Sequence, residues 1–180
     1  MALPRKLKNF NLFVDGISFV GHAVEIQLPK LSRKVEEYRG GGMNGPVEVD
    51  LGGEKLEIEH SYGGLMKEIL LQYGATKADA VLLRFAGAYQ RDDTGDVDAV
   101  EVTVRGRHQE IDPGKAKGGD DTEFKVKSSL TYYKLSINGV VLIEIDHLNM
   151  IENIGGVDML AEQRSAIGMR QLFNRTATCD

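Results

Sequence analysis

Apolar and polar residues alternate along several stretches of the chain, and each alternating stretch predicts a β-strand with one buried face. The strongest is residues 122–146, TEFKVKSSLTYYKLSINGVVLIEID, where Asn138-Gly139 separates two runs rich in β-branched and aromatic residues. This dipeptide favours a two-residue type I′ turn, because both central positions of that turn need positive φ. The sequence therefore predicts a long antiparallel hairpin over these residues.

Antiparallel pairing about this turn predicts the cross-strand neighbours of the hairpin. The predicted pairs are Ile137 with Val140, Leu135 with Leu142, and Tyr133 with Glu144. The alternation changes phase at Tyr132-Tyr133, which predicts a β-bulge or a change of neighbouring strand there. Near the turn both faces are apolar, so this end is covered either by another element of the same chain or by another chain.

Other stretches predict further strands and two helices. The strands are expected at residues 9–20 (a hairpin about Asp15-Gly16), 24–28, 55–59, 80–90 and 100–109. Ser61 is a suitable N-cap for a helix over about residues 61–73, with Gly74 as its left-handed stop. Met66 and Tyr73 share the apolar stripe of that helix and are expected in the core. A shorter helical pattern covers residues 158–167, closed by Gly168.

Together these elements predict one mainly β domain over residues 1–180, with an antiparallel β-barrel or sandwich as its architecture. We expect one flanking helix, a short C-terminal helix, and a long extended loop over about residues 35–53. The length of 180 residues is enough for a single hydrophobic core.

Several predicted strands carry a hydrophilic face opposite their apolar face. The hydrophilic positions are Glu25, Gln27, Glu57, Glu59, Glu101, Thr103, Lys125, Lys127 and Ser129. Such strands suit a sheet that packs on a core behind and faces water in front. A barrel or a ring of joined sheets has this arrangement and removes exposed edges.

Composition and charge narrow the functional class. The formal net charge of −5 argues against a protein that grips nucleic acid through a basic face. The chain has no apolar run long enough to span a membrane and no secretory signal at its N-terminus, so we expect no membrane partner. The single cysteine, Cys179, cannot form an internal disulfide, which fits a reducing compartment.

Short motifs give no convincing enzyme site, cofactor site or metal site. Residues 40–45 spell G-x-G-x-x-G, but the preceding KVEEYR and the following Pro46 do not supply the strand and helix of a dinucleotide site, so a long mobile loop or arm is favoured. Asp93-Thr94-Gly95 spells the aspartic-protease triplet, which needs two copies and an apolar setting, whereas this one lies in an acidic turn. That turn does not match an EF-hand, since Val97 and Thr103 fall at its sixth and twelfth positions. The four histidines lack metal-ligand spacing.

Long strings of the sequence resemble the major tail tube proteins of contractile-tailed bacteriophages, and the chain is also similar to R-type bacteriocin tube proteins. The strings are MALPRKLKNFNLFVDG, GGGMNGPVEVDLG, RFAGAYQRDDTGDVDAVEVTVRGRHQEID, GDDTEFKVKSSLTYYKLSINGVVLIEID and VDMLAEQRSAIGM. The likeness covers residues 1 to about 168, and strings of this length are far more specific than three-letter motifs.

The resemblance implies a structural virion protein without a cofactor. Proteins of this family form hexameric rings that stack into a hollow tube inside a contractile sheath, and DNA passes through the lumen without specific binding. The implied partners are copies of the chain itself, the tail sheath, the tape-measure protein, and the baseplate or terminator proteins. The implied location is the virion tail, assembled in the host bacterial cytoplasm.

The resemblance also implies roles for particular segments. The loop over residues 35–53 is expected to contact neighbouring subunits and adjacent rings. Its tip consists of Arg39, Gly40, Gly41, Gly42, Met43, Asn44 and Gly45. The hydrophilic strand positions given above, from Glu25 to Ser129, are the candidates for the lumen wall, and the apolar end of the long hairpin is a candidate subunit contact.

Two alternatives of other classes stay open at this stage. A small ligand-binding β-barrel predicts a monomer with an apolar cavity. A dimeric protease, much less favoured, predicts loss of activity on Asp93→Asn.

Overall fold

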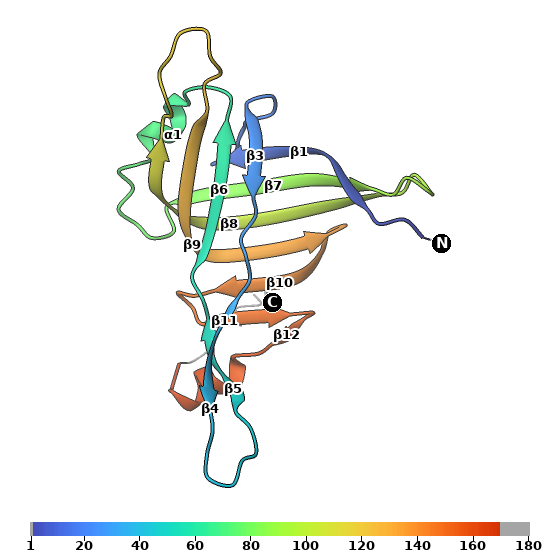
Figure 1. Cartoon of the computed structure of the whole chain (residues 1–180), viewed down its shortest axis with the longest axis vertical. Coiled ribbons are helices and arrows are strands. Elements are labelled where there is room, and N and C mark those ends of the chain that lie inside the picture. The colour runs from blue at the N-terminus through green and yellow to red at the C-terminus, as the bar shows by residue number, and fades with distance from the viewer. Residues whose placement is uncertain (1, 170–180) are drawn as a thin grey trace, which may run out of the picture.

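The computed structural model describes residues 2–169, which form two β layers whose strands run across each other (Figure 1). In chain order the elements are β1 (Lys6–Val14), β2 (Ile17–Ser18), β3 (Ala23–Gln27), β4 (Arg33–Tyr38), β5 (Val47–Gly53), β6 (Leu56–Tyr62), α1 (Lys67–Leu71), β7 (Val81–Gln90), β8 (Val97–Asp112), β9 (Phe124–Ile137), β10 (Val140–Asp146), β11 (Ile151–Ile154), β12 (Val157–Asp158) and α2 (Ala161–Ala166). The predicted mainly β, antiparallel fold is confirmed, in its sandwich form.

One layer, the wide layer, has the strand order β12-β11-β10-β9-β8-β7-β1-β2. The other, the four-stranded layer, has the order β3-β6-β9-β8 and uses the first half of β9 and the last part of β8. Strands β8 and β9 therefore belong to both layers and bend from one into the other. The sheet does not close into a barrel over the described residues.

The bend lies at the predicted phase change of the long hairpin. Arg105 pairs with Tyr132 and Gly106 pairs with Leu130, so Thr131 is an extra residue in β9. A bulge of this kind bends a strand and reverses which side chains face inward. The predicted irregularity next to Tyr132 is thus confirmed.

The core lies between the two layers. Its buried side chains come from the wide layer (Leu12, Val14, Val81, Leu83, Phe85, Val102, Val104, Tyr133), from the four-stranded layer (Leu56, Ile58, Tyr62, Phe124, Val126, Leu130), and from Phe19 and Ile69. Full burial of one large apolar side chain stabilises a fold by about 1.5–3 kcal/mol. These side chains fill the space that a ligand-binding barrel would keep empty.

The predicted turn at Asn138-Gly139 is present, with φ of 50° and 80°. Ile137 pairs with Val140 as predicted. The other two predicted pairs are wrong, because Leu142 is an extra residue in β10. Leu135 therefore pairs with Ile143, and Tyr133 pairs with Ile145.

The helix predicted over residues 61–73 is wrong in its first half. Ser61 lies in strand β6, opposite Lys125 of β9, and the helix α1 covers Lys67–Leu71 alone. Strand β6 pairs with β3 on one side and β9 on the other, and these long-range hydrogen bonds outweigh local helix propensity.

The apolar stripe of the predicted helix is mostly exposed. Ile69 is fully buried and Met66 packs against the core, whereas Tyr73 is 60% exposed. The expectation that Tyr73 is a core residue is therefore wrong. Gly74 does not have the positive φ expected of a left-handed stop.

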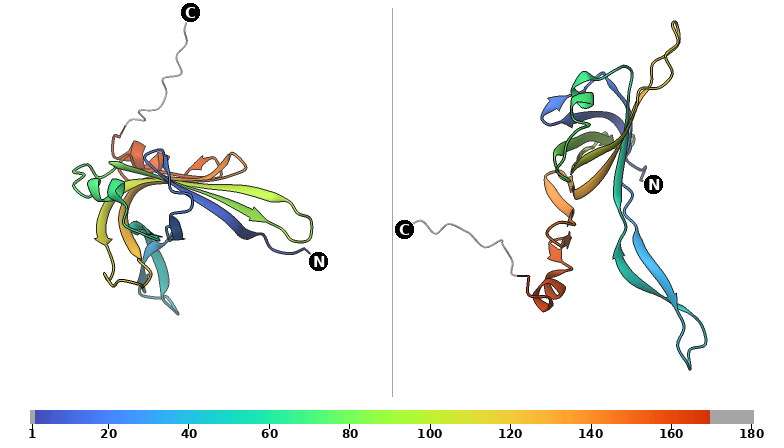
Figure 2. Two further views of the ribbon diagram at one scale, coloured as in Figure 1. Left: turned by 90° about the horizontal axis from the view of Figure 1, so that it is seen from above. Right: turned by 90° about the vertical axis from the view of Figure 1, so that its left-hand side faces the viewer.

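The loop expected over residues 35–53 is instead a β-hairpin, formed by β4 and β5, which pair only with each other. This arm continues the direction of β3 and β6 and projects away from both layers (Figures 1 and 2). At the C-terminal end, α2 is shorter than the predicted helix, and Gly168 has the expected positive φ. Cys179 lies outside the described residues, and none of the described helices is long and apolar enough to cross a membrane.

Candidate assembly surfaces

The outer face of the four-stranded layer brings together most of the candidate lumen residues. They are Glu25 and Gln27 on β3, Glu57 and Glu59 on β6, and Lys125, Lys127 and Ser129 on β9. Register places them in cross-strand rows, such as Gln27, Glu59, Lys127 and Glu110. Residues directly opposite on paired strands share a face, so the rows form one hydrophilic surface.

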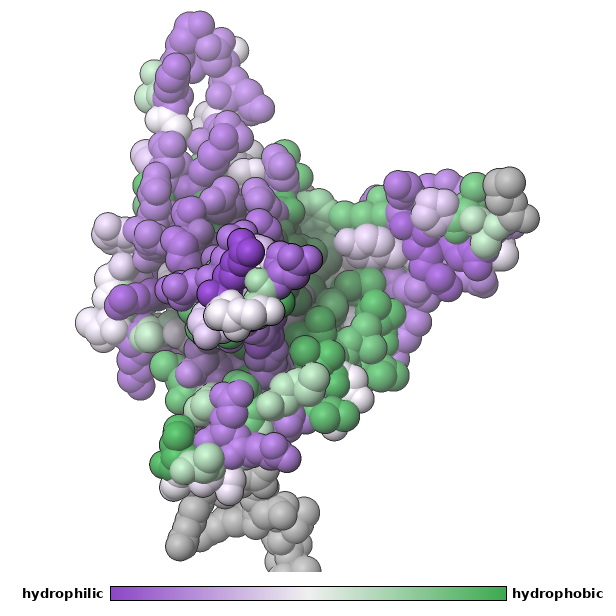
Figure 3. Space-filling model, turned by 60° about the horizontal axis from the view of Figure 1, so that its bottom comes forward, coloured by the Kyte–Doolittle hydropathy of each residue, from purple (hydrophilic) through white to green (hydrophobic). Residues whose placement is uncertain are grey.

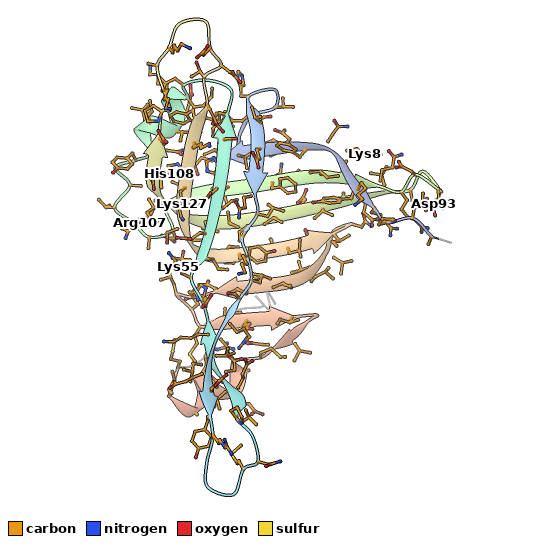
Figure 4. The ribbon with its side chains drawn as sticks, viewed as in Figure 1. Lys8, Lys55, Asp93, Arg107, His108 and Lys127 are labelled. Atoms are coloured by element: carbon orange, nitrogen blue, oxygen red, sulfur yellow. The ribbon has the colours of Figure 1, made fainter. Side chains whose placement is uncertain are left out.

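Charges of both signs compensate one another on this surface (Figure 4). Lys127 Nζ lies 3.2 Å from Glu59 Oε1 and 3.3 Å from Glu57 Oε2, and Lys55 Nζ lies 2.7 Å from Glu57 Oε1. Hydrogen bonds to Glu59 and Glu57 raise the pKa of Lys127, and the hydrogen bond from Lys55 lowers the pKa of Glu57. Exposed ion pairs add little stability, so their effect is mainly to leave no strong field of one sign.

The same face is hollowed by a groove of 380 Å³. Its lining residues are Glu25, Gln27, Glu59, His60, Ser61, Glu110, Asp112, Lys125, Val126 and Lys127. Acidic groups outnumber basic groups in this set, so the groove lacks the concentrated positive charge that binds a phosphate backbone.

Glu101 and Thr103 lie apart from the other candidates. They sit on β8 opposite Ser136 and Lys134 of β9, on the outer face of the wide layer, where Arg84 Nη1 is 3.6 Å from Glu101 Oε1. The outer faces of two packed layers point away from each other. One wall therefore cannot contain both groups.

Both lateral edges of the four-stranded layer are unpaired within residues 2–169. Strand β3 pairs only with β6, and β8 beyond Gly106 pairs only with β9. Each strand of this layer is antiparallel to its neighbour, so β3 and β8 run in opposite directions. An open edge presents free N–H and C=O groups that favour pairing with another chain.

The arm has one apolar face. Tyr38 pairs with Val47, and Val49 lies on the same face as this pair, with exposed fractions of 59%, 48% and 43%. An isolated two-stranded hairpin is only marginally stable in water. At its base, Arg33 Nη1 lies 2.5 Å from Glu152 Oε1 of β11, but a groove of 800 Å³ separates the arm from β10 and β11. The apolar face is therefore left without a partner among the described residues.

The tip of the arm, Arg39 to Gly45, is a turn closed by its own backbone. Met43 N donates to Gly40 O at 3.3 Å, Gly40 N lies 3.1 Å from Met43 Sδ, and Arg39 Nε donates to Met43 O at 3.4 Å. Strand β5 follows the tip, so the glycine motif does not open a helix whose N-terminus could hold a phosphate.

Asp93 of the protease-like triplet is held by local hydrogen bonds. Arg91 Nε and Nη2 lie 3.0 Å and 2.5 Å from its carboxylate, and Leu3 N donates to it at 3.2 Å. The Arg91 guanidinium lowers the pKa of Asp93, whereas a shared-proton dyad raises the pKa of one partner. Within residues 2–169, no three His, Cys, Asp or Glu side chains are grouped to hold a metal ion.

Three buried polar side chains, those of His60, Tyr62 and His108, lie close together, and the sequence did not predict this group. The ring of His60 is 2% exposed, and neither its nitrogens nor Tyr62 Oη has a hydrogen-bond partner in the described part of the chain. His108, whose ring centroid is 6.0 Å from that of His60, bonds to Ser128 and to Gln72. The sequence does contain a signal for the burial of His60, because this residue continues the inward-facing alternation of Leu56 and Ile58.

The sequence matches a known protein family. Residues 4–168 match a family described as phage tail tube protein FII. The chain belongs to this family. The tail tube protein of Escherichia phage P2 is 52% identical over 172 residues, covering 94% of this chain and 100% of that protein. The major tail tube protein of Serratia phage KSP20 is 44% identical, covering 94% and 99%.

Solved structures share the fold of this tail tube protein at low sequence identity. A chain of the sheath/tube terminator of an extracellular contractile injection system, PVC, has a TM-score of 0.57 and 11% identity, covering 74% of this chain and 96% of that chain. A chain of the PVC sheath–tube complex has a TM-score of 0.55 and 12% identity, covering 76% and 93%. Membership of this family makes the protein a structural component of a virion tail rather than an enzyme. This confirms the expectation from the resemblance.

Proposed function

We propose that this tail tube protein forms hexameric rings that stack into a hollow tube, through which DNA leaves the virion. The observation that carries the proposal is the pair of unpaired edges on the four-stranded layer. Because β3 and β8 run in opposite directions, β8 of one copy beside β3 of the next continues the antiparallel pattern. Repeated around an axis parallel to these strands, this heterologous contact closes into a ring with no free edge.

In such a ring the outer face of the four-stranded layer becomes the lumen wall. Glu25, Glu59 and Lys127 then face the channel together with their row neighbours, while Glu101 and Thr103 face away from it. Mixed charge with no basic cluster lets a phosphate backbone pass without being held. DNA passage without specific binding is consistent with this surface.

Stacking follows from the shape of the subunit. The arm and the loop of residues 113–123 project to opposite ends along the strand direction of the four-stranded layer (Figure 1). An arm that extends along the ring axis reaches a copy in the adjoining ring, with the tip residues Arg39 to Gly45 as the leading contact.

The further partners we propose are the sheath, the tape-measure protein, and the baseplate or terminator proteins. The support is the family itself and the shared fold with chains in a sheath–tube complex, a sheath/tube terminator and an anti-feeding prophage baseplate. As a virion component, the protein would assemble in the cytoplasm of the host bacterium.

The edge contact can be tested by cysteine cross-linking in a Cys179→Ala background. Glu25→Cys on β3 is combined in turn with Arg107→Cys, Gln109→Cys or Asp112→Cys on β8, which together sample the possible registers. A disulfide needs Cα atoms within about 7 Å, so only joined edges can be linked. We expect at least one pair to oxidise into a ladder of oligomers that ends at the hexamer.

The matched control combines Glu25→Cys with Ser129→Cys. Ser129 lies on β9, whose two edges are already occupied by β6 and β8, so no ladder is expected. Electron microscopy of the same samples shows whether rings and tubes form. Tubes that yield no ladder from any pair would contradict the edge contact, and a protein that stays monomeric at high concentration would contradict the ring.

A further inference from the structure

The inner face of the wide layer continues beyond the part that the four-stranded layer and the other described residues cover. One cross-strand row runs from Val102 through Leu135 and Ile143 to Ile154 and Val157. Exposure rises along this row, from 2% at Val102 to 40% at Ile154 and 61% at Val157. The core face therefore extends into solvent as an apolar surface.

A second row extends the same surface. Val100 pairs with Ile137, which pairs with Val140, and Val140 is 63% exposed. We call Val100, Ile137, Val140, Ile154 and Val157 the apolar shelf. Figure 3 shows hydrophobic residues gathered on this side of the molecule, below the projecting β7–β8 hairpin. A contiguous apolar patch on a subunit of an assembly marks an interaction surface.

The position of the shelf identifies its occupant. Viewed from above, the two layers separate on the side of β3 and meet on the side where β8 and β9 bend (Figure 2). The shelf lies on the same open side as the unpaired edge of β3, and β10–β12, which carry most of it, lie below β3 (Figure 1). The next copy in the proposed ring enters on this side, because its β8 pairs with that edge.

Ring symmetry then selects the contacting segment. Rotation about the ring axis leaves every residue at its own height, so the shelf of β10–β12 meets a segment at the level of those strands on the opposite side. Strand β10 begins at the Asn138-Gly139 turn on the shelf side and ends at the turn of residues 147–150 on the other side (Figure 1). That turn carries Leu148, which is 57% exposed.

We propose that the apolar shelf binds a second copy of the chain, which inserts Leu148 of its β10–β11 turn. The inference rests on the proposed ring and adds the apolar contact that accompanies the edge pairing. It is a heterologous contact, since the shelf and Leu148 lie on opposite sides of one subunit.

Aspartate substitutions test both halves of this contact. Val157→Asp and Leu148→Asp each place a charge in the interface, and each is expected to raise the protein concentration needed for ring formation roughly tenfold or more. Both residues are exposed, so circular dichroism and the unfolding midpoint should stay as in the wild type. The variant with the conservative substitution Leu148→Met should still form rings.

Mixing the two variants gives a sharper test. Val157→Asp keeps an intact Leu148, and Leu148→Asp keeps an intact shelf, so one good contact remains between unlike copies. We expect the mixture to form dimers that do not close into rings, as measured by light scattering after size-exclusion chromatography. Each variant alone should remain mainly monomeric at the same concentration.

Cross-linking supplies an independent readout. Val157→Cys with Leu148→Cys should link neighbouring copies. Val157→Cys with Leu71→Cys should not, because Leu71 is more exposed than Leu148 but lies on α1, at another level of the subunit. If rings and the β3–β8 ladder form while both aspartate variants assemble normally, the shelf contact is wrong and the ring proposal stands. If the wild type forms no rings, both proposals fail.

Discussion

At the scale of single residues, Gly106 is where the bend between the layers is decided. A Cβ at this position would lie 2.0 Å from the carbonyl oxygen of Ser129, closer than any side chain can approach backbone. The bulge at Thr131 brings the two strands this close, so only a residue without a side chain fits. A glycine within a strand pattern is a known mark of such a close backbone approach.

Gly106→Ala is expected to destabilise the fold by about 1–3 kcal/mol, because β8 and β9 must move apart at the bend. Urea unfolding measures the change. Gly118→Ala is the control, since nothing lies within 4 Å of its Cβ position, and it should change stability by less than about 0.5 kcal/mol. Equal stability of the two variants would contradict the close packing at the bend.

His60 is a second residue whose chemistry depends on burial. Desolvation, together with the smaller effect of the neighbouring His108, lowers its pKa from 6.5 to about 3. His108 also has a lowered pKa through burial, opposed by the charge of Asp15. Since the folded-state pKa of His60 lies below its unfolded value, its contribution to stability is complete above pH 6.5 and is lost as the pH falls toward 3.

The free energy of unfolding should therefore fall on acidification. One pKa unit corresponds to about 1.4 kcal/mol, so His60 alone should remove about 2 kcal/mol between pH 6.5 and about pH 5. Urea unfolding of wild type and His60→Leu at several pH values measures this. Parallel pH profiles for the two proteins would contradict the role of His60; we expect the variant to lose less stability in this range.

At the scale of elements, the arm shows how a strand pair is held without a core. Within the described residues, strands β4 and β5 pair only with each other. Arg33 at the base of the arm bonds across it to Asp50 and outward to Glu152 of β11. The apolar face at Tyr38 and Val49 contributes nothing to the fold of this subunit. In the proposed tube, this face is buried against another copy.

Deletion of residues 40–45 should leave the two layers intact and impair stacking, because the tip contacts neither layer. We expect the unfolding midpoint to change little, and electron microscopy to show separate rings in place of tubes. Val49→Asp keeps the length of the arm and should weaken stacking as well. Loss of folding on deletion would show that the arm belongs to the core, contrary to the structure.

At the scale of the whole molecule, the described residues 2–169 leave two surfaces incomplete. The four-stranded layer ends in two free edges, and the wide layer ends in the apolar shelf. The β3 edge and the shelf lie on the same side of the subunit, so one neighbour in the proposed ring contacts both. In the proposed ring, edge pairing gives direction and apolar burial gives affinity.

The sequence by itself determined the local structure. Alternation predicts the strands, Asn138-Gly139 and Asp15-Gly16 supply the positive φ of their turns, and the phase change at Tyr132-Tyr133 marks the bend. These features follow from covalent geometry and side-chain chemistry, so they are readable over a few residues. The long strings of the tail tube family likewise identify the protein without coordinates.

Only the tertiary structure decided which segments meet. Pairing with β3 and β9 made residues 61–62 a strand instead of a helix, and the extra residue Leu142 shifted the register of β10. The separation of Glu101 from Glu59, the free edges and the shelf depend on contacts between residues far apart in sequence. The alternation of polar and apolar residues shows that a strand has a solvent-exposed face. The direction in which that face points is set by the packing of one layer on another.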